Sequence, residues 1–148
     1  MRGAFGGWEF SGATRFQSGQ YLTVNGTSSN AAQNRRALYL GGDTALPSDQ
    51  RGPNKWFHTA VFAAPPTTGL GNAGIGSVLG PGWEVWDVSL RKEFSATERV
   101  KIKFRADAFN SFNHVNLNNP GTTIGGGFGT ITSDQPPRQI QFGLNVAF

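Results

Sequence analysis

The chain has 148 residues, of which 12% are aromatic, with 21 Gly, 8 Pro, no Cys and a net charge of +4. Without Cys there is no disulfide framework and no thiolate metal site, and two isolated residues, His58 and His114, make a poor metal set. No stretch approaches the roughly 18 apolar residues of a membrane-spanning helix. We therefore expect one β-rich domain that binds no metal and no cofactor.

The N-terminus, MRGAFGGWEF, lacks the apolar core of a signal peptide. If the chain belongs outside the cytoplasm, we expect its export signal to be missing from this sequence. The positive charge permits binding to nucleic acid, but the basic residues are scattered along the whole chain and form no clustered face. We therefore expect no nucleic-acid partner.

Four segments alternate between apolar and polar residues and predict long β-strands, near residues 5–17, 84–94, 98–110 and 138–148. The even-numbered face of the first three carries these apolar residues: Trp8, Phe10, Phe16, Trp86, Val88, Leu90, Phe94, Ile102 and Phe104. The odd-numbered face carries these charged residues: Arg15, Asp87, Arg91, Glu93, Lys101, Lys103, Arg105 and Asp107. Lys92 is an exception on the apolar face.

The connections between these strands are unequal. The second and third strands are joined by the short stretch SATER, whereas residues 18–82 and 111–137 are long loops rich in Gly, Asn, Pro and Ser. Strands of about 10 residues match those that cross a membrane at a tilt. Short turns on one side and long loops on the other are typical of outer-membrane barrels, which predicts that both long loops are extracellular.

The tight turn leaves two strand registers open, because opposed residues must point to the same face and the turn then contains an odd number of residues. A three-residue turn, Ser95–Thr97, would place Asp87 opposite Arg105. A five-residue turn would place Asp87 opposite Asp107. We predict the first register, because it pairs opposite charges.

The apolar face must be covered, since each large apolar side chain left in water forgoes about 1.5–3 kcal/mol. A second sheet could cover it, as in a soluble β-sandwich. The dense charge on the opposite face and the aromatic residues near the strand ends instead favour lipid on the even face and water on the odd face. An open sheet edge in lipid leaves backbone groups unpaired, so we expect this chain to be the C-terminal piece of a larger closed barrel.

Four motifs occur in order: NKWFHTAVFAAPPTTGLGNAG, GPGWEVWDVSLRKEF, ERVKIKFRADAFNSFNHVNLNNP and FGTITSDQPPRQIQFGLNVAF. Together they resemble the C-terminal end of TonB-dependent outer-membrane receptors, and most closely the Oar-like receptors that carry a carboxypeptidase-regulatory-like domain. The likeness covers most of the chain and is strongest from Asn54 to Phe148. It departs from the family at Ile75, where a basic residue is usual, and at Val115, where Pro is common.

The resemblance implies a barrel of about 22 strands around a plug, in which energised ligand uptake depends on TonB. This chain would supply the last four strands and would be inactive alone. The implied partners are outer-membrane lipid, the remaining barrel and plug, and TonB indirectly through the missing plug. The implied location is the outer membrane of a Gram-negative-type bacterium.

The terminal strand also resembles the signal that the barrel-assembly machinery reads on outer-membrane proteins. The matching residues are Phe142, Leu144, Val146 and the final aromatic Phe148. Recognition of this kind works by strand addition, in which backbone hydrogen bonds give affinity and alternate side chains give specificity.

Signals for catalysis are weak. Gly69, Gly71 and Gly74 spell GxGxxG, but AAPPTT precedes them in place of a strand, so we reject dinucleotide binding. No nucleophile lies in a recognised context, and we predict no catalytic residue. The alternatives to a receptor are a soluble extracellular sandwich that binds carbohydrate through Trp83 and Trp86, and a porin-type or adhesin-type barrel.

Overall fold

The computed structural model describes residues 6–27, 36–66 and 69–148, and residue 5 of the first predicted strand lies outside these ranges. Its elements are β1 Trp8–Gln17, β2 Tyr21–Leu22, β3 Leu38–Tyr39, β4 Phe62–Ala63, β5 Val78–Leu79, β6 Trp83–Ser95, β7 Lys101–Phe109 and β8 Gln139–Ala147, with 3₁₀ turns η1 Ser48–Gln50 and η2 Thr59–Val61. In these ranges no helix is long and apolar enough to cross a membrane. The chain divides into two compact units, a long sheet and a loop unit.

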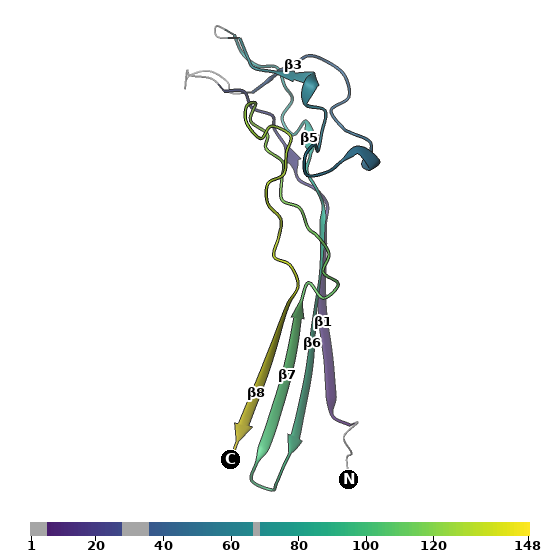
Figure 1. Cartoon of the computed structure of the whole chain (residues 1–148), viewed down its shortest axis with the longest axis vertical. Coiled ribbons are helices and arrows are strands. Elements are labelled where there is room, and N and C mark those ends of the chain that lie inside the picture. The colour runs from purple at the N-terminus through teal and green to yellow at the C-terminus, as the bar shows by residue number, and fades with distance from the viewer. Residues whose placement is uncertain (1–5, 28–35, 67–68) are drawn as a thin grey trace. The chain divides into compact units, whose positions relative to one another are not determined.

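The long sheet contains four strands in the order β1-β6-β7-β8, which is also their order along the chain (Figure 1). The β6–β7 and β7–β8 pairs are antiparallel. Gly7 lies beside the carbonyl of Glu93 and Gly12 beside that of Asp87, so β1 runs antiparallel to β6 as well. The predicted all-β up-and-down meander is confirmed. The third strand begins at Lys101, three residues later than the sequence predicts.

The even-numbered face of this sheet is apolar and is open to the surroundings. Phe10, Phe142 and Leu144 are 72%, 75% and 70% exposed, and Phe104 is half-buried. The buried apolar residues of the described chain all belong to the loop unit. The described residues form one four-stranded sheet and two separate two-stranded sheets, which differ from the two packed long sheets of the sandwich alternative.

The predicted register of the β6–β7 hairpin is also wrong. Ser95 pairs with Lys101, which leaves a turn of five residues, 96–100. Asp107 lies opposite Ser89, and Asp87 therefore lies opposite neither Arg105 nor Asp107. The turn closes on Thr97, whose Oγ1 accepts hydrogen bonds from the backbone N of Arg99 at 3.3 Å and of Val100 at 3.1 Å. Charge pairs alone favour the other register, because they do not include the hydrogen bonds of this hydroxyl.

This register follows the sequence pattern in one respect. The paired residue numbers in β6–β7 and in β7–β8 always sum to an even number, so even-numbered residues lie beside even-numbered residues across three strands. A one-residue slip would move every side chain of a strand to the other face. The alternation therefore predicts the faces, while the chemistry of the turn sets the pairing.

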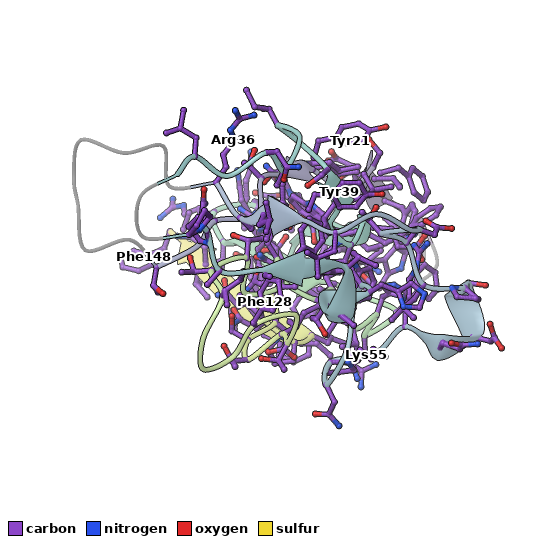
Figure 2. All side chains as sticks on the ribbon, turned by 90° about the horizontal axis from the view of Figure 1, so that it is seen from above. Tyr21, Arg36, Tyr39, Lys55, Phe128 and Phe148 are labelled. Atoms are coloured by element: carbon purple, nitrogen blue, oxygen red, sulfur yellow. The ribbon has the colours of Figure 1, made fainter. Side chains whose placement is uncertain are left out.

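The loop unit comprises residues 18–83 and 116–135 and has a core of its own. The sheet pairs are β2 with β5 and β3 with β4. The core residues are Val24, Ala37, Phe57, Phe62, Ala73 and Val78. Tyr39 and Phe128 pack against this cluster, and Lys55 is exposed on the outside of the unit (Figure 2).

The two segments that the sequence predicts as separate long loops interlock within this unit. Asn25 donates its backbone N–H to Thr122 O at 2.9 Å, and Asn25 O accepts from the N–H of Ile124 at 2.9 Å. Trp56 N donates to Gly129 O at 2.9 Å. The ring of Phe57 lies edge-on to that of Phe128, with centroids 5.3 Å apart. The two predicted loops therefore form one packed unit, which the sequence did not predict.

Gly71 allows another close approach of two backbone segments within the loop unit. A Cβ at this position would lie 1.7 Å from the carbonyl oxygen of Arg36. Gly71→Ala must displace the backbone that carries Ala37 and Ala73, and we expect a loss of about 1–3 kcal/mol from the loop unit. Limited proteolysis of the loops measures this loss. Gly52→Ala is the matched control, since a Cβ there meets nothing within 4 Å, and equal protease resistance of both variants would contradict the prediction.

Candidate functional site: the two faces and the loop end of the sheet

The apolar face is held together by aromatic contacts between strands. The ring of Phe104 on β7 stacks on that of Phe142 on β8, with centroids 6.3 Å apart. On its other side Phe104 meets Trp8 of β1 edge-on, also at 6.3 Å. These rings make a continuous apolar surface across the sheet. In the β6–β7 pair, the register places Val88, Leu90 and Phe94 opposite even-numbered residues of β7.

Aromatic residues gather at both ends of this surface. At one end Trp86 lies edge-on to Phe16 and to Phe112, with centroids 5.6 Å apart in each pair. Near the other end lie Trp8 and Phe94. Trp86 and Phe94 are eight residues apart on β6, which corresponds to about 27 Å along the strand. Membrane barrels carry aromatic girdles at either side of an apolar band roughly 25 Å tall.

The charged face contains a ladder of paired side chains. Lys103 Nζ lies 3.2 Å from Glu93 Oε2. Asp107 binds both of its neighbours, with Arg105 Nε at 2.6 Å from Oδ2 and Ser89 Oγ donating to Oδ1 at 2.7 Å. Lys103 and Arg105 are therefore each paired with a carboxylate on the same face, as is expected of a hydrated wall.

Three other predicted members of this face lie apart from the ladder. Arg15 lies on β1, and Lys101 lies opposite Ser95 beside the turn. Asp87 serves the end of the neighbouring strand, where its Oδ1 accepts a hydrogen bond from the backbone N of Asn110 at 3.0 Å.

Asp107 lies next to two like charges, because Arg91 and Arg105 are directly opposed across β6 and β7. Opposed like charges destabilise a sheet. We expect Asp107→Ala to lower the urea midpoint of the folded barrel in detergent, and to do so more strongly at low salt. Glu93→Gln removes a more exposed ion pair and should have a smaller effect.

The double variant Asp107→Ala with Arg91→Gln should recover part of the lost stability, because it removes one of the two opposed guanidinium groups. No recovery, together with no dependence on salt, would contradict the role given to Asp107.

At the loop end of the sheet, in the stretch FNSFNH, two Asn residues have roles that were not predicted from the sequence. Asn110 is 6% exposed with a φ of 47°, and its Oδ1 accepts from the backbone N of His114 at 2.9 Å. Its Nδ2 donates to the carbonyl oxygens of His114 at 2.9 Å and Pro136 at 3.4 Å. Asn113, with a φ of 53°, accepts at Oδ1 from the backbone N of Arg138 at 3.1 Å.

These bonds tie the end of β7 to the segment that leads into β8. Two Asn residues three positions apart after a strand were the available signal, because Asn tolerates positive φ and bonds to nearby backbone.

Two further features of the sequence, His114 and the GxGxxG stretch, have contacts in the structure. His114 Nδ1 lies 3.7 Å from Glu84 Oε1, and the backbone of His114, not its ring, caps the strand end through Asn110. The described ranges contain no cluster of His, Asp and Glu that could hold a metal. Gly71 of the GxGxxG stretch packs against the backbone of Arg36.

The terminal strand β8 is exposed along its whole length. Ile140, Phe142, Leu144 and Val146 are all exposed, and Phe148 is fully exposed. In the described sheet β8 pairs only with β7, so its other edge is open to a further strand.

Residues 1–141 match a family model described as an outer membrane beta barrel domain. The chain belongs to this family. No match was found among curated proteins or among solved structures. As an outer-membrane β-barrel protein, the chain is located in the outer membrane of Gram-negative-type bacteria, and its four long strands are part of a transmembrane barrel.

Membership explains the exposed apolar face. In a barrel wall, side chains alternate between lipid and the interior along each strand. Thus an even face without charge at its centre and an odd face with paired charges are both expected of this barrel.

Proposed function

We propose that this barrel segment is part of a TonB-dependent receptor, in which the complete barrel surrounds a plug and imports a ligand with energy delivered through TonB. The single observation that carries the proposal is the ordered set of four motifs resembling these receptors from Asn54 to Phe148. The family match supports the barrel itself. The segment is non-catalytic and serves as wall and loops.

The connectivity supports this role. A five-residue turn joins β6 to β7, whereas 18–82 and 110–138 join the strands at their other ends. Because short turns of membrane barrels face the periplasm, the loop unit is extracellular. A loop unit with its own core of Phe57, Phe62 and their neighbours provides a stable outer surface, where ligand recognition is expected.

The open edges of the sheet support a larger assembly. Each unpaired backbone group in hydrocarbon costs several kcal/mol, so β1 and β8 require further strands beside them. The remaining barrel of the receptor supplies these strands. During assembly, the exposed edge of β8 with Phe142, Leu144, Val146 and Phe148 is the segment that the barrel-assembly machinery recognises by strand addition.

The charged wall argues for a hydrated interior and gives no evidence of a selective anion site. Arg105 and Lys103 bond to Asp107 and Glu93 on the same face. Substrate choice is therefore expected from the loops and the plug.

The proposal is tested on the complete protein, purified from outer membranes. A receptor should bind the purified periplasmic domain of TonB and should show no steady conductance in a planar bilayer, because its plug closes the barrel. Steady open conductance without binding to TonB would contradict the proposal and identify a porin. Recovery of the protein in the soluble fraction without detergent would contradict the membrane barrel as well.

A further inference from the structure

The apolar face carries a charge near each end and none between them. Among the even-numbered residues of β1, β6, β7 and β8, only Glu84 and Lys92 are charged. Both lie on β6 and are eight residues apart, which is about 27 Å along the strand. The separation is close to the height of the apolar band of a membrane barrel before tilt is taken into account. Lys92 therefore marks one boundary of that band.

Lys92 lies among aromatic side chains. Its Nζ is 4.7 Å from the centroid of the Trp8 ring, and the register places Lys92 directly opposite Phe104. The side chain is half-buried. A long basic side chain of this kind covers apolar surface with its stem and carries its charge towards the polar boundary.

An open groove of about 1390 Å³ adjoins this position. Its lining includes the apolar residues Trp8, Phe94, Phe104 and Leu144, and it also includes Lys92, Glu93 and Lys101. The groove thus combines apolar side chains with two ammonium groups and one carboxylate, and the ammonium group of Lys92 lies beside the indole of Trp8. That combination matches a molecule with a long hydrocarbon chain and an anionic head.

The position of Lys92 along β6 indicates which part of a lipid molecule its ammonium group would meet. A Lys at the midplane of a barrel wall costs about 2–4 kcal/mol, but close to the interface it costs about 0–1 kcal/mol. Lys92 is three residues before the end of β6 at the short turn, and we therefore expect its ammonium group near the membrane interface.

We propose that Lys92 and Trp8 form a binding site for an anionic glycerophospholipid, with the phosphate on Lys92 and an acyl chain along Phe104 and Leu144. The choice of a glycerophospholipid rests on the periplasmic placement of the short turn under the proposed function, since that leaflet of the outer membrane consists of glycerophospholipids.

The test uses the complete protein reconstituted in vesicles of equal parts phosphatidylethanolamine and phosphatidylglycerol. Lipids that stay bound after transfer to detergent are counted by native mass spectrometry. Wild-type protein should retain phosphatidylglycerol in preference, and Lys92→Met should reduce this retention about fivefold. Lys92→Arg should preserve it, and Leu90→Met, on the same face of β6, should leave it unchanged.

Equal retention of phosphatidylglycerol by wild type and Lys92→Met would overturn the proposal, as would equal retention of both lipids by the wild type. Preferential retention of lipopolysaccharide from outer-membrane extracts would place the site in the other leaflet, and would overturn both this proposal and the sidedness of the proposed receptor. Loss of TonB binding, with phosphatidylglycerol retention intact, would remove the receptor function alone.

Discussion

Phe142→Arg should lower the free energy of unfolding of the inserted barrel by about 2–4 kcal/mol, whereas Gln141→Arg, one residue earlier on the same strand, should be tolerated. Phe142 is 75% exposed on the apolar face and pairs with Ala106. An Arg near the middle of a lipid-facing strand costs about 2–4 kcal/mol. Gln141 lies on the charged face opposite Asp107, where a guanidinium group meets water and a carboxylate.

The measurement is the free energy of unfolding in urea for the complete barrel in phospholipid vesicles. Phe142→Leu provides a further comparison, because it removes the stacking contact with Phe104 and adds no charge. Phe142→Leu should lower the free energy of unfolding less than Phe142→Arg does. If Gln141→Arg is as damaging as Phe142→Arg, then the two faces do not differ in solvent, and the assignment of lipid to the even face is wrong.

Asn110→Ala should destabilise the loop end of the sheet by about 2–4 kcal/mol. The change removes three side-chain bonds to the backbone of His114 and Pro136, each worth about 0.5–1.5 kcal/mol. It also places a Cβ without a bonding side chain at a φ of 47°, which costs roughly 1–2 kcal/mol. The urea midpoint of the barrel measures the sum.

Two matched variants separate these contributions. Asn110→Gly keeps the conformational freedom and loses the bonds, while Asn110→Asp keeps the acceptor for His114 N and loses the two bonds from Nδ2. Stability should decrease in the order wild type, Asp, Gly, Ala. Equal stability of the Ala and Gly variants would show that the positive φ carries no cost, and an unaffected Asp variant would rule out a contribution from the bonds of Nδ2.

The faces of the long sheet were predictable because they depend only on alternation. Phe104 and Arg105 must point to opposite sides of any strand, whatever lies beside it. The register was not predictable from charge, because the hydroxyl of Thr97 and the pair of Ser89 with Asp107 weigh as much as any ion pair. Thr97 and Ser89 are uncharged, so a comparison of opposite charges does not include their hydrogen bonds.

The loop unit was not predictable because its contacts are long-range. The core brings Phe57 beside Phe128, and backbone bonds join Asn25 to Thr122, although nearly a hundred residues separate the latter pair. No local periodicity encodes such pairs. By contrast, the turn at Asn110 and Asn113 could have been recognised, since its signal is local and depends on residues that favour positive φ.

The most direct test of the account places single Cys residues along β8 in the complete barrel in its own membrane, any Cys elsewhere having been replaced, because this chain itself has none. The positions are Gln139, Ile140, Gln141, Phe142, Gly143, Leu144, Asn145 and Val146. We predict that a water-soluble thiol reagent modifies Cys at the odd-numbered positions, which face water, and does not modify Cys at the even-numbered positions, which face lipid. Modification without alternation, or with the opposite parity, would contradict it.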